Sequence, residues 1–160
     1  MKCKNFFKTM TAAICAASLL MTGCGSDKAA DDTIKIGAIG EMTGGNASYG
    51  TSMMRGFKLA VKEINANGGV NGKKLVLVEA DTKSEPAEAA NAMSKLINQD
   101  KVPMVAGIFT SSSAIAARNI SETAKIPYLA IGATNPSVTL AKDGSTKPNT
   151  FRVCFIDPFQ

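Results

Sequence analysis

From Thr33 onward, the chain alternates short apolar runs with stretches in which apolar residues recur every three or four positions. The apolar runs predict β-strands at 34–39, 75–78, 104–108, 126–131 and 151–155. The stretches between the first four runs predict helices that begin near Thr51, Pro86 and Ser111. Strands and helices that alternate in this way form right-handed βαβ crossovers. We therefore expect an α/β fold with a parallel sheet and helices on both faces.

Each predicted helix has one apolar face that should turn toward the sheet. The residues expected to face inward are Met54, Phe57, Ala60, Val61 and Ile64, then Ala89, Ala90, Met93, Leu96 and Ile97, then Ala116, Ala117, Ile120 and Ala124. The second strand, Leu75 to Val78, is continuously apolar, which is typical of a strand covered on both faces. The segment after Ile131 is predicted to be a loop until the strand at Phe151.

The segment before this alternation has the features of a secretion leader. It starts with Lys2, Lys4 and Lys8, contains no acid, and continues in a short apolar run from Met10 to Met21. A basic start, a short apolar middle and small residues at the end indicate a secretory signal peptide, here residues 1–23. The apolar run is shorter than the roughly 20 residues that a membrane span requires.

The end of the leader resembles a bacterial lipobox, in which a cysteine is acylated before cleavage. Met21 occupies the position where leucine is usual, and Cys24 is the acylated residue by this reading. An ordinary cleaved signal with an incidental cysteine is the alternative. We expect a lipoprotein anchored through Cys24 to the outer face of a membrane. Residues 24–33, which are small and polar, would be a flexible tether to a domain at 34–160.

Composition excludes several kinds of chemistry. The chain has no histidine, which excludes Ser-His and Cys-His nucleophile pairs. Once the leader is removed and Cys24 is acylated, Cys154 remains as a single thiol. No intramolecular disulfide is then available, and we expect no metal site and no cofactor. The net charge of +5 owes three lysines to the leader, and no long Lys/Arg run occurs, so nucleic acid is not an expected partner.

The glycines after the first strand do not form a nucleotide-binding motif. Gly37, Gly40 and Gly44 have the spacing GxxGxxxG rather than GxGxxG, and no Walker loop or Gly-x-Ser-x-Gly elbow is present. A secreted enzyme with a nucleotide-binding sheet is therefore disfavoured. The acids near the strand ends are expected to be solvated or to cap loops rather than to act as acid–base groups or Mg²⁺ ligands. These acids are Glu41, Glu79 and Asp81.

Ligands of open parallel sheets collect at the carboxyl ends of the strands. Three predicted loops leave these ends, at 40–50, 110–113 and 132–136. In the second loop, the hydroxyls and free N–H groups of Ser111 and Ser112 favour an anion such as a carboxylate. The alternative is that one serine only caps the helix.

The other two loops offer complementary groups. Carbonyl and hydroxyl oxygens between Gly132 and Thr134 can accept hydrogen bonds from an ammonium group, although a plain turn before Pro136 is the alternative. Tyr49, in the first loop, can form an aromatic wall with a polar tip, or it can simply anchor the loop.

Five motifs together resemble the leucine/isoleucine/valine-binding proteins, which are type I periplasmic-binding proteins that serve ABC importers. The motifs lie at 34–50, 63–72, 111–113, 132–136 and 151–152. The resemblance extends from about Thr33 to Gln160 and implies the first lobe of a two-lobed clamshell. The second lobe would be largely missing, so we suspect an N-terminal fragment.

The resemblance also implies residue roles. It assigns the ligand carboxylate to Ser111 and Ser112, the ammonium to the Gly132 carbonyl, and the main-chain groups of the ligand to Thr134. Ala133, between Gly132 and Thr134, is also expected at the ligand. Tyr49 would line the slot for the ligand side chain. Some members of the family join the loops after strands two and three by a disulfide, which is absent here because the matching position holds Thr110.

We therefore expect a monomeric, extracytoplasmic, non-enzymatic protein that captures a free amino acid, with a branched-chain one as the default. Its partners would be this amino acid and an ABC permease. A ligand-sensing receptor domain for amino acids, amides or urea is the alternative.

Overall fold

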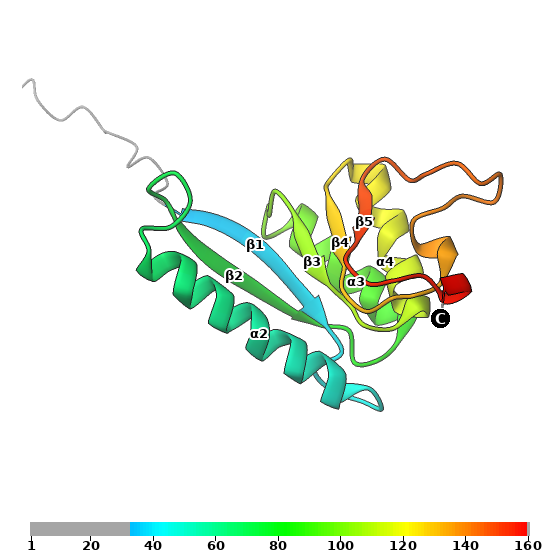
Figure 1. Cartoon of the computed structure of the whole chain (residues 1–160), viewed down its shortest axis with the longest axis horizontal. Helices are drawn as coiled ribbons and strands as arrows, with labels where there is room; N and C mark the ends of the chain where they lie inside the picture. The colour runs from blue at the N-terminus through cyan, green and yellow to red at the C-terminus, as the bar shows by residue number, and fades with distance from the viewer. Residues whose placement is uncertain (1–32, 160) are drawn as a thin grey trace, which may run out of the picture. The chain divides into compact units, whose positions relative to one another are not determined.

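The computed structural model describes residues 33–159, so the predicted signal peptide, Cys24 and nearly all of the tether lie outside the described residues. A sheet of five parallel strands forms the centre, in the order β2-β1-β3-β4-β5 (Figure 1). The strands are β1 (Thr33–Gly40), β2 (Lys74–Asp81), β3 (Val105–Gly107), β4 (Tyr128–Ala130) and β5 (Thr150–Arg152). The predicted parallel α/β sheet is confirmed.

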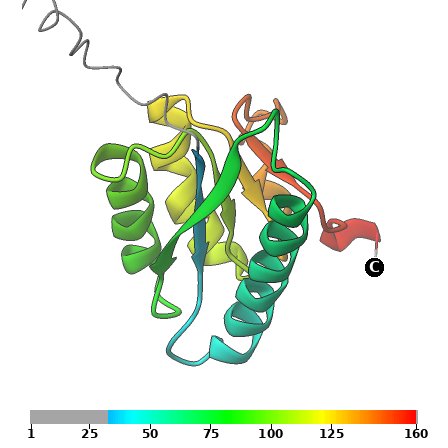
Figure 2. The same ribbon diagram turned by 90° about the vertical axis from the view of Figure 1, so that its left-hand side faces the viewer.

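Three α-helices cover the two faces of this sheet. Helix α2 (Ala47–Ala66) packs against β1 and β2 on one face, whereas α3 (Pro86–Asn98) and α4 (Ser111–Ala124) pack side by side on the other (Figure 2). Two short 3₁₀ helices, η1 (Pro136–Val138) and η2 (Asp157–Phe159), follow β4 and β5. Within residues 33–159, no helix combines the length and apolar character needed to cross a membrane.

The hydrophobic core lies mainly between the sheet and the α3–α4 layer. It contains fully buried residues from the strands and from both helices, including Ile39, Val105, Tyr128, Met93, Leu96 and Ala117. Pro86 opens α3, as predicted, at a position where its missing N–H has no intrahelical partner to lose. The inward face of α3 also matches the prediction, with Ala89, Met93, Leu96 and Ile97 all buried.

Fewer residues of α2 are buried than the sequence predicted. Only Gly50 and Met54 of α2 are buried, whereas Ala60 is exposed and the side chain of Ile64 is 38% exposed. On α4, Ala124 is likewise exposed. The predicted Ala117 is buried and the predicted Ile120 packs against the core, and Ser113, Ala114 and Ser121 complete the inward face of α4.

Several boundaries differ from the prediction, and one of them moves a site residue. Helix α2 begins at Ala47 rather than Thr51, so Tyr49 lies in its first turn and not in a loop. Strand β2 runs to Asp81 and lies at the edge of the sheet, which leaves Val76 42% exposed rather than covered on both faces.

Candidate functional site

Three segments that the sequence placed at the carboxyl ends of strands lie close together. The ring of Tyr49, on α2, stacks on the ring of Phe109, which follows β3; the centroids are 4.5 Å apart and the planes differ by 8°. Gly132, which follows β4, also lies against the Phe109 ring, because a Cβ at this position would be only 2.4 Å from Phe109 Cδ2. Phe109 therefore joins Tyr49 to Gly132. Sequence reasoning missed Phe109, although it directly precedes the serine loop.

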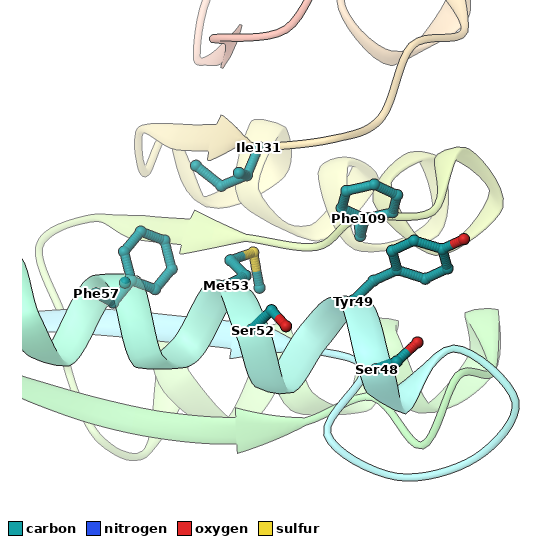
Figure 3. Close-up of a pocket in the computed structure, with 8 residues that line it drawn as sticks. Ser48, Tyr49, Ser52, Met53, Phe57, Phe109 and Ile131 are labelled. Carbon is teal, nitrogen blue, oxygen red and sulfur yellow. The ribbon is translucent and has the colours of Figure 1, made fainter.

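A hollow of about 610 Å³ opens beside this stacked pair. It is lined by Ser48, Tyr49, Ser52, Met53, Gly56, Phe57, Phe109 and Ile131 (Figure 3). The rings and the Met53 side chain give it mainly apolar walls. Tyr49 thus lies where an apolar ligand group can pack, whereas Ser111, Ser112 and Thr134 are not among the residues that line this hollow.

The start of α4 provides the polar part of the candidate site. Helix geometry leaves the amides of Thr110, Ser111, Ser112 and Ser113 without intrahelical partners. The first amide beyond them, that of Ala114, donates to the Thr110 carbonyl at 3.0 Å. These free N–H groups and the helix dipole attract an anion.

The outermost of these amides, that of Thr110, already donates a hydrogen bond to Glu41. Its carboxylate accepts hydrogen bonds from the Thr110 amide at 3.0 Å and the Thr110 hydroxyl at 2.7 Å, and also from the Phe109 amide at 3.0 Å. Glu41 is fully buried, so it caps the helix start as a buried group and is not solvated. The alternative in which a serine caps the helix is wrong: the N-cap residue is Thr110, and its side chain makes no capping hydrogen bond. An external anion must therefore use the amides from Ser111 onward.

Ser111 connects the second predicted loop to the third. Its Oγ accepts a hydrogen bond from the Asn135 amide at 3.2 Å. Because a serine hydroxyl has one hydrogen to donate as well as two lone pairs, the Ser111 hydrogen stays available for a ligand. Ser112 is exposed at the helix start, while the buried hydroxyl of Ser113 has no hydrogen-bond partner among the described residues.

The third loop presents mainly its backbone. Ala133 is fully buried, and its methyl group packs in the core, so only its main-chain groups can meet a ligand. Gly132 and Thr134 are half-buried. Arg152 donates to the carbonyls of Ala133 and Thr134, both at 3.0 Å. The structure therefore brings Ser111 and the 132–136 loop together, as sheet geometry predicted.

The backbone before α4 has an uncommon conformation. Ile108 is fully buried with a φ of 58°, which is costly for a β-branched side chain. Its amide donates to the Ile39 carbonyl at 2.8 Å, and its carbonyl accepts from the Gly132 amide at 3.4 Å. Strained residues of this kind persist where the surrounding structure fixes them, often beside functional sites. Here the strained residue directs the chain from β3 toward Phe109 and α4.

Two further acids lie near the carboxyl end of β2 and form polar contacts there. Asp81 accepts hydrogen bonds from the amides of Met42, Thr43 and Lys83 and from the Thr43 hydroxyl. Partial burial alone would raise the pKa of Asp81, but these hydrogen bonds together lower it below its ordinary value. Glu79 pairs with Lys58 at 3.0 Å across exposed surface. Asp81 therefore has the predicted loop-capping role.

Comparison with known proteins identifies the family. The family model described as "Periplasmic binding protein" matches residues 33–158. The chain belongs to the periplasmic binding protein family. Its members are solute-binding proteins rather than enzymes, and the family implies an extracytoplasmic location.

Relatives of known type agree with this assignment. The chain is 40% identical over 136 residues to an amino acid binding protein of Pseudomonas aeruginosa and covers 35% of its length. Identity to the leucine-specific-binding protein of Salmonella typhimurium is 38%, again over 35% of that protein. The chain thus spans about a third of the length of these relatives. The resemblance to leucine/isoleucine/valine-binding proteins is confirmed.

Solved structures agree with the sequence relatives. The substrate-binding protein of a branched-chain amino acid transporter from Streptococcus pneumoniae, solved in complex with isoleucine, is 41% identical with a TM-score of 0.73. The alignment covers 78% of this chain and 34% of that one. A leucine-binding protein of Thermotoga maritima is 37% identical with a TM-score of 0.71. This alignment covers 79% of the present chain and 34% of the Thermotoga protein.

Proposed function

We propose that the complete protein is the extracytoplasmic substrate-binding component of an ABC importer. It captures a free amino acid with a branched aliphatic side chain and delivers it to a membrane permease. It acts as a monomer and is held at the membrane by a lipid on Cys24. The described residues form the lobe that the ligand meets first.

One observation carries this proposal: the free amides at the start of α4 lie next to the aromatic pair formed by Tyr49 and Phe109. The amides and hydroxyls of Ser111 and Ser112 suit a carboxylate, and the Gly132 carbonyl with the Thr134 side chain suits an ammonium group. The stacked rings and the adjoining hollow suit an aliphatic side chain. The leucine and isoleucine in the names of the relatives support the same ligand class.

Binding proceeds without covalent chemistry. The amino acid docks on this lobe, and the second lobe then closes over it and excludes water. Exclusion of water strengthens each charge-assisted hydrogen bond, because the local dielectric falls. The ligand drives closure only to the extent that it binds the closed state better than the open one.

Titration calorimetry of the full-length protein tests the proposal. The ligands are the twenty amino acids, urea, short amides and NAD. We expect saturable binding of leucine, isoleucine or valine and no heat from NAD. Binding of NAD without any amino acid would contradict the proposal and favour an enzyme instead.

A separate experiment tests the anchor. Metabolic labelling with radioactive palmitate should label the wild-type protein, and Cys24→Ser should abolish the label. Equal labelling of both proteins would mean that the lipid is not attached to Cys24, and it would leave the proposed ligand unaffected.

A further inference from the structure

Arg152, the last residue of β5, donates hydrogen bonds to consecutive backbone carbonyls of the loop at 132–136. Its Nη1 donates to the carbonyls of Ala133 and Thr134 at 3.0 Å and of Asn135 at 3.1 Å. Its Nη2 donates to the carbonyl of Pro136 at 3.3 Å. Four consecutive carbonyl oxygens therefore turn toward one side chain.

The guanidinium group of Arg152 donates hydrogen bonds to this backbone and to one hydroxyl. Nη2 also donates to Thr139 Oγ1 at 2.6 Å. Among residues 33–159, the ion pairs involve three lysines and do not include Arg152. Its hydrogen bonds are charge-assisted, which makes them stronger than those between neutral groups. Arg152 consequently fixes the conformation of a loop instead of pairing with an acid.

The orientation of these carbonyls affects the candidate site. The Asn135 carbonyl faces Arg152, and the Asn135 amide donates to Ser111 Oγ at 3.2 Å. A continuous chain of hydrogen bonds thus runs from Arg152 through the loop to Ser111. Arg152 contacts the carbonyls from Ala133 to Pro136 but not that of Gly132. The Gly132 carbonyl is the one that the proposed function assigns to the ligand ammonium.

A second arginine provides a natural comparison. Arg118, on α4, donates through Nη1 to the carbonyls of Ser137, Val138 and Leu140. It holds the next part of the same segment by the same chemistry. None of its three carbonyl partners belongs to a residue that the proposed function places at the ligand.

We propose that Arg152 is a positioning residue for the ligand-binding loop at 132–136. It does not touch the ligand; it holds the loop so that the Gly132 carbonyl, the Thr134 hydroxyl and the Ser111 hydroxyl converge. Only a planar, forked side chain can reach this set of oxygens, so lysine cannot replace it. This inference rests on the proposed function.

The test compares Arg152→Lys with Arg118→Lys in the full-length protein, with leucine as the probe in titration calorimetry. Both variants keep the positive charge. We expect Arg152→Lys to weaken leucine binding by about tenfold, as for the loss of hydrogen bonds to a charged group. Arg118→Lys should change binding by less than about twofold, although both variants should lower the melting temperature to a similar extent.

A double-mutant cycle with Thr134→Val separates positioning from general stability. Because Arg152 acts partly through the orientation of Thr134, the double variant should bind leucine less weakly than the product of the two single effects predicts. Should Arg152→Lys fail to fold, Thr139→Val removes only the hydroxyl that accepts from Nη2, and it should weaken leucine binding about two- to threefold.

The outcomes distinguish this inference from the function on which it rests. Wild-type protein that binds no amino acid overturns both. Wild-type protein that binds leucine, with Arg152→Lys within twofold of it, overturns the positioning role alone. The same holds if the Arg152→Lys and Thr134→Val effects simply multiply, or if Arg118→Lys weakens binding as much as Arg152→Lys.

Discussion

Glu41 and Thr110, 69 residues apart in the sequence, form a partly buried contact between the end of β1 and the start of α4. The Thr110 hydroxyl lies 2.7 Å from Glu41 Oε1, and the Thr110 amide lies 3.0 Å from the same oxygen. A negative group at this position compensates the positive end of the α4 dipole. The contact also takes up helix amides, and so defines which of them remain for a ligand.

Removing the Thr110 hydroxyl should destabilise the protein. Thr110→Val keeps the shape of the side chain but deprives a buried carboxylate of one donor, which should cost about 1.5–3 kcal/mol of unfolding free energy. Thr43→Val is the matched control, because the Thr43 hydroxyl donates to Asp81 at an exposed position. Water can replace this donor, so the control should cost less than about 1 kcal/mol. Urea denaturation measures both, and equal losses would contradict the importance of the contact between Thr110 and the buried Glu41.

Two glycines of α2 should respond to alanine in opposite directions. At Gly50, a Cβ would lie 2.1 Å from the Glu41 carbonyl oxygen, so Gly50→Ala should force the helix away from β1 and destabilise the protein by about 1–3 kcal/mol. At Gly56, no atom lies within 4 Å of the added Cβ. Gly56→Ala should therefore stabilise the helix by up to about 1 kcal/mol. Urea midpoints test the pair, and a Gly50→Ala variant as stable as wild type would refute the close packing.

The hydrogen bonds to Asp81 predict a dependence of stability on pH. Because the folded-state pKa of Asp81 is lowered, its contribution to stability is present above its ordinary pKa and is lost as the pH falls through the lowered value. The stability gap between wild type and Asp81→Asn should thus be full above about pH 5 and close on further acidification.

Nuclear magnetic resonance titration of the Asp81 carboxyl carbon tests the cause of this shift directly. The Thr43 hydroxyl is one of the donors that lower the pKa. Thr43→Val should therefore move the Asp81 pKa upward. An unchanged titration curve in this variant would mean that the three backbone amides alone account for the shift.

The sequence allowed the alternation of elements to be predicted, but it did not reveal contacts between distant residues. Helix α3 was predictable because Pro86 opens it and its apolar stripe is regular. The start of α2 was not, because glycines precede it and the side chain of its N-cap residue, Asn46, makes no capping hydrogen bond. The burial of Glu41 had no local signal, since its donors lie 68 and 69 residues further along the chain.

In the candidate site, too, some residues could be predicted from the sequence and others could not. Parallel-sheet geometry alone placed the loops that carry Ser111 and Gly132 at the same edge of the sheet, and the structure shows that these loops leave neighbouring strands. Phe109 and Arg152 could not be assigned to it. Their importance comes from a ring contact with Tyr49 and from hydrogen bonds to loop carbonyls, and neither leaves a pattern in the residues nearby.

Two serines of α4 provide the most direct test of the polar half of the site. Ser111 Oγ accepts from the Asn135 amide, and its hydrogen is the proposed donor to the ligand carboxylate. Ser111→Ala in the full-length protein should therefore cost about 1.5–3 kcal/mol of leucine affinity, which is roughly a ten- to hundredfold rise in Kd.

Ser113→Ala is the control for this prediction, since it removes a buried hydroxyl that has no hydrogen-bond partner in the described part of the chain. Removal of an unsatisfied polar group should leave stability equal or higher, and leucine affinity should stay within about twofold of wild type. Calorimetric titration compares the two variants under the same conditions. If Ser111→Ala binds leucine as tightly as wild type, or if Ser113→Ala weakens binding equally, the carboxylate does not bind through the Ser111 hydroxyl.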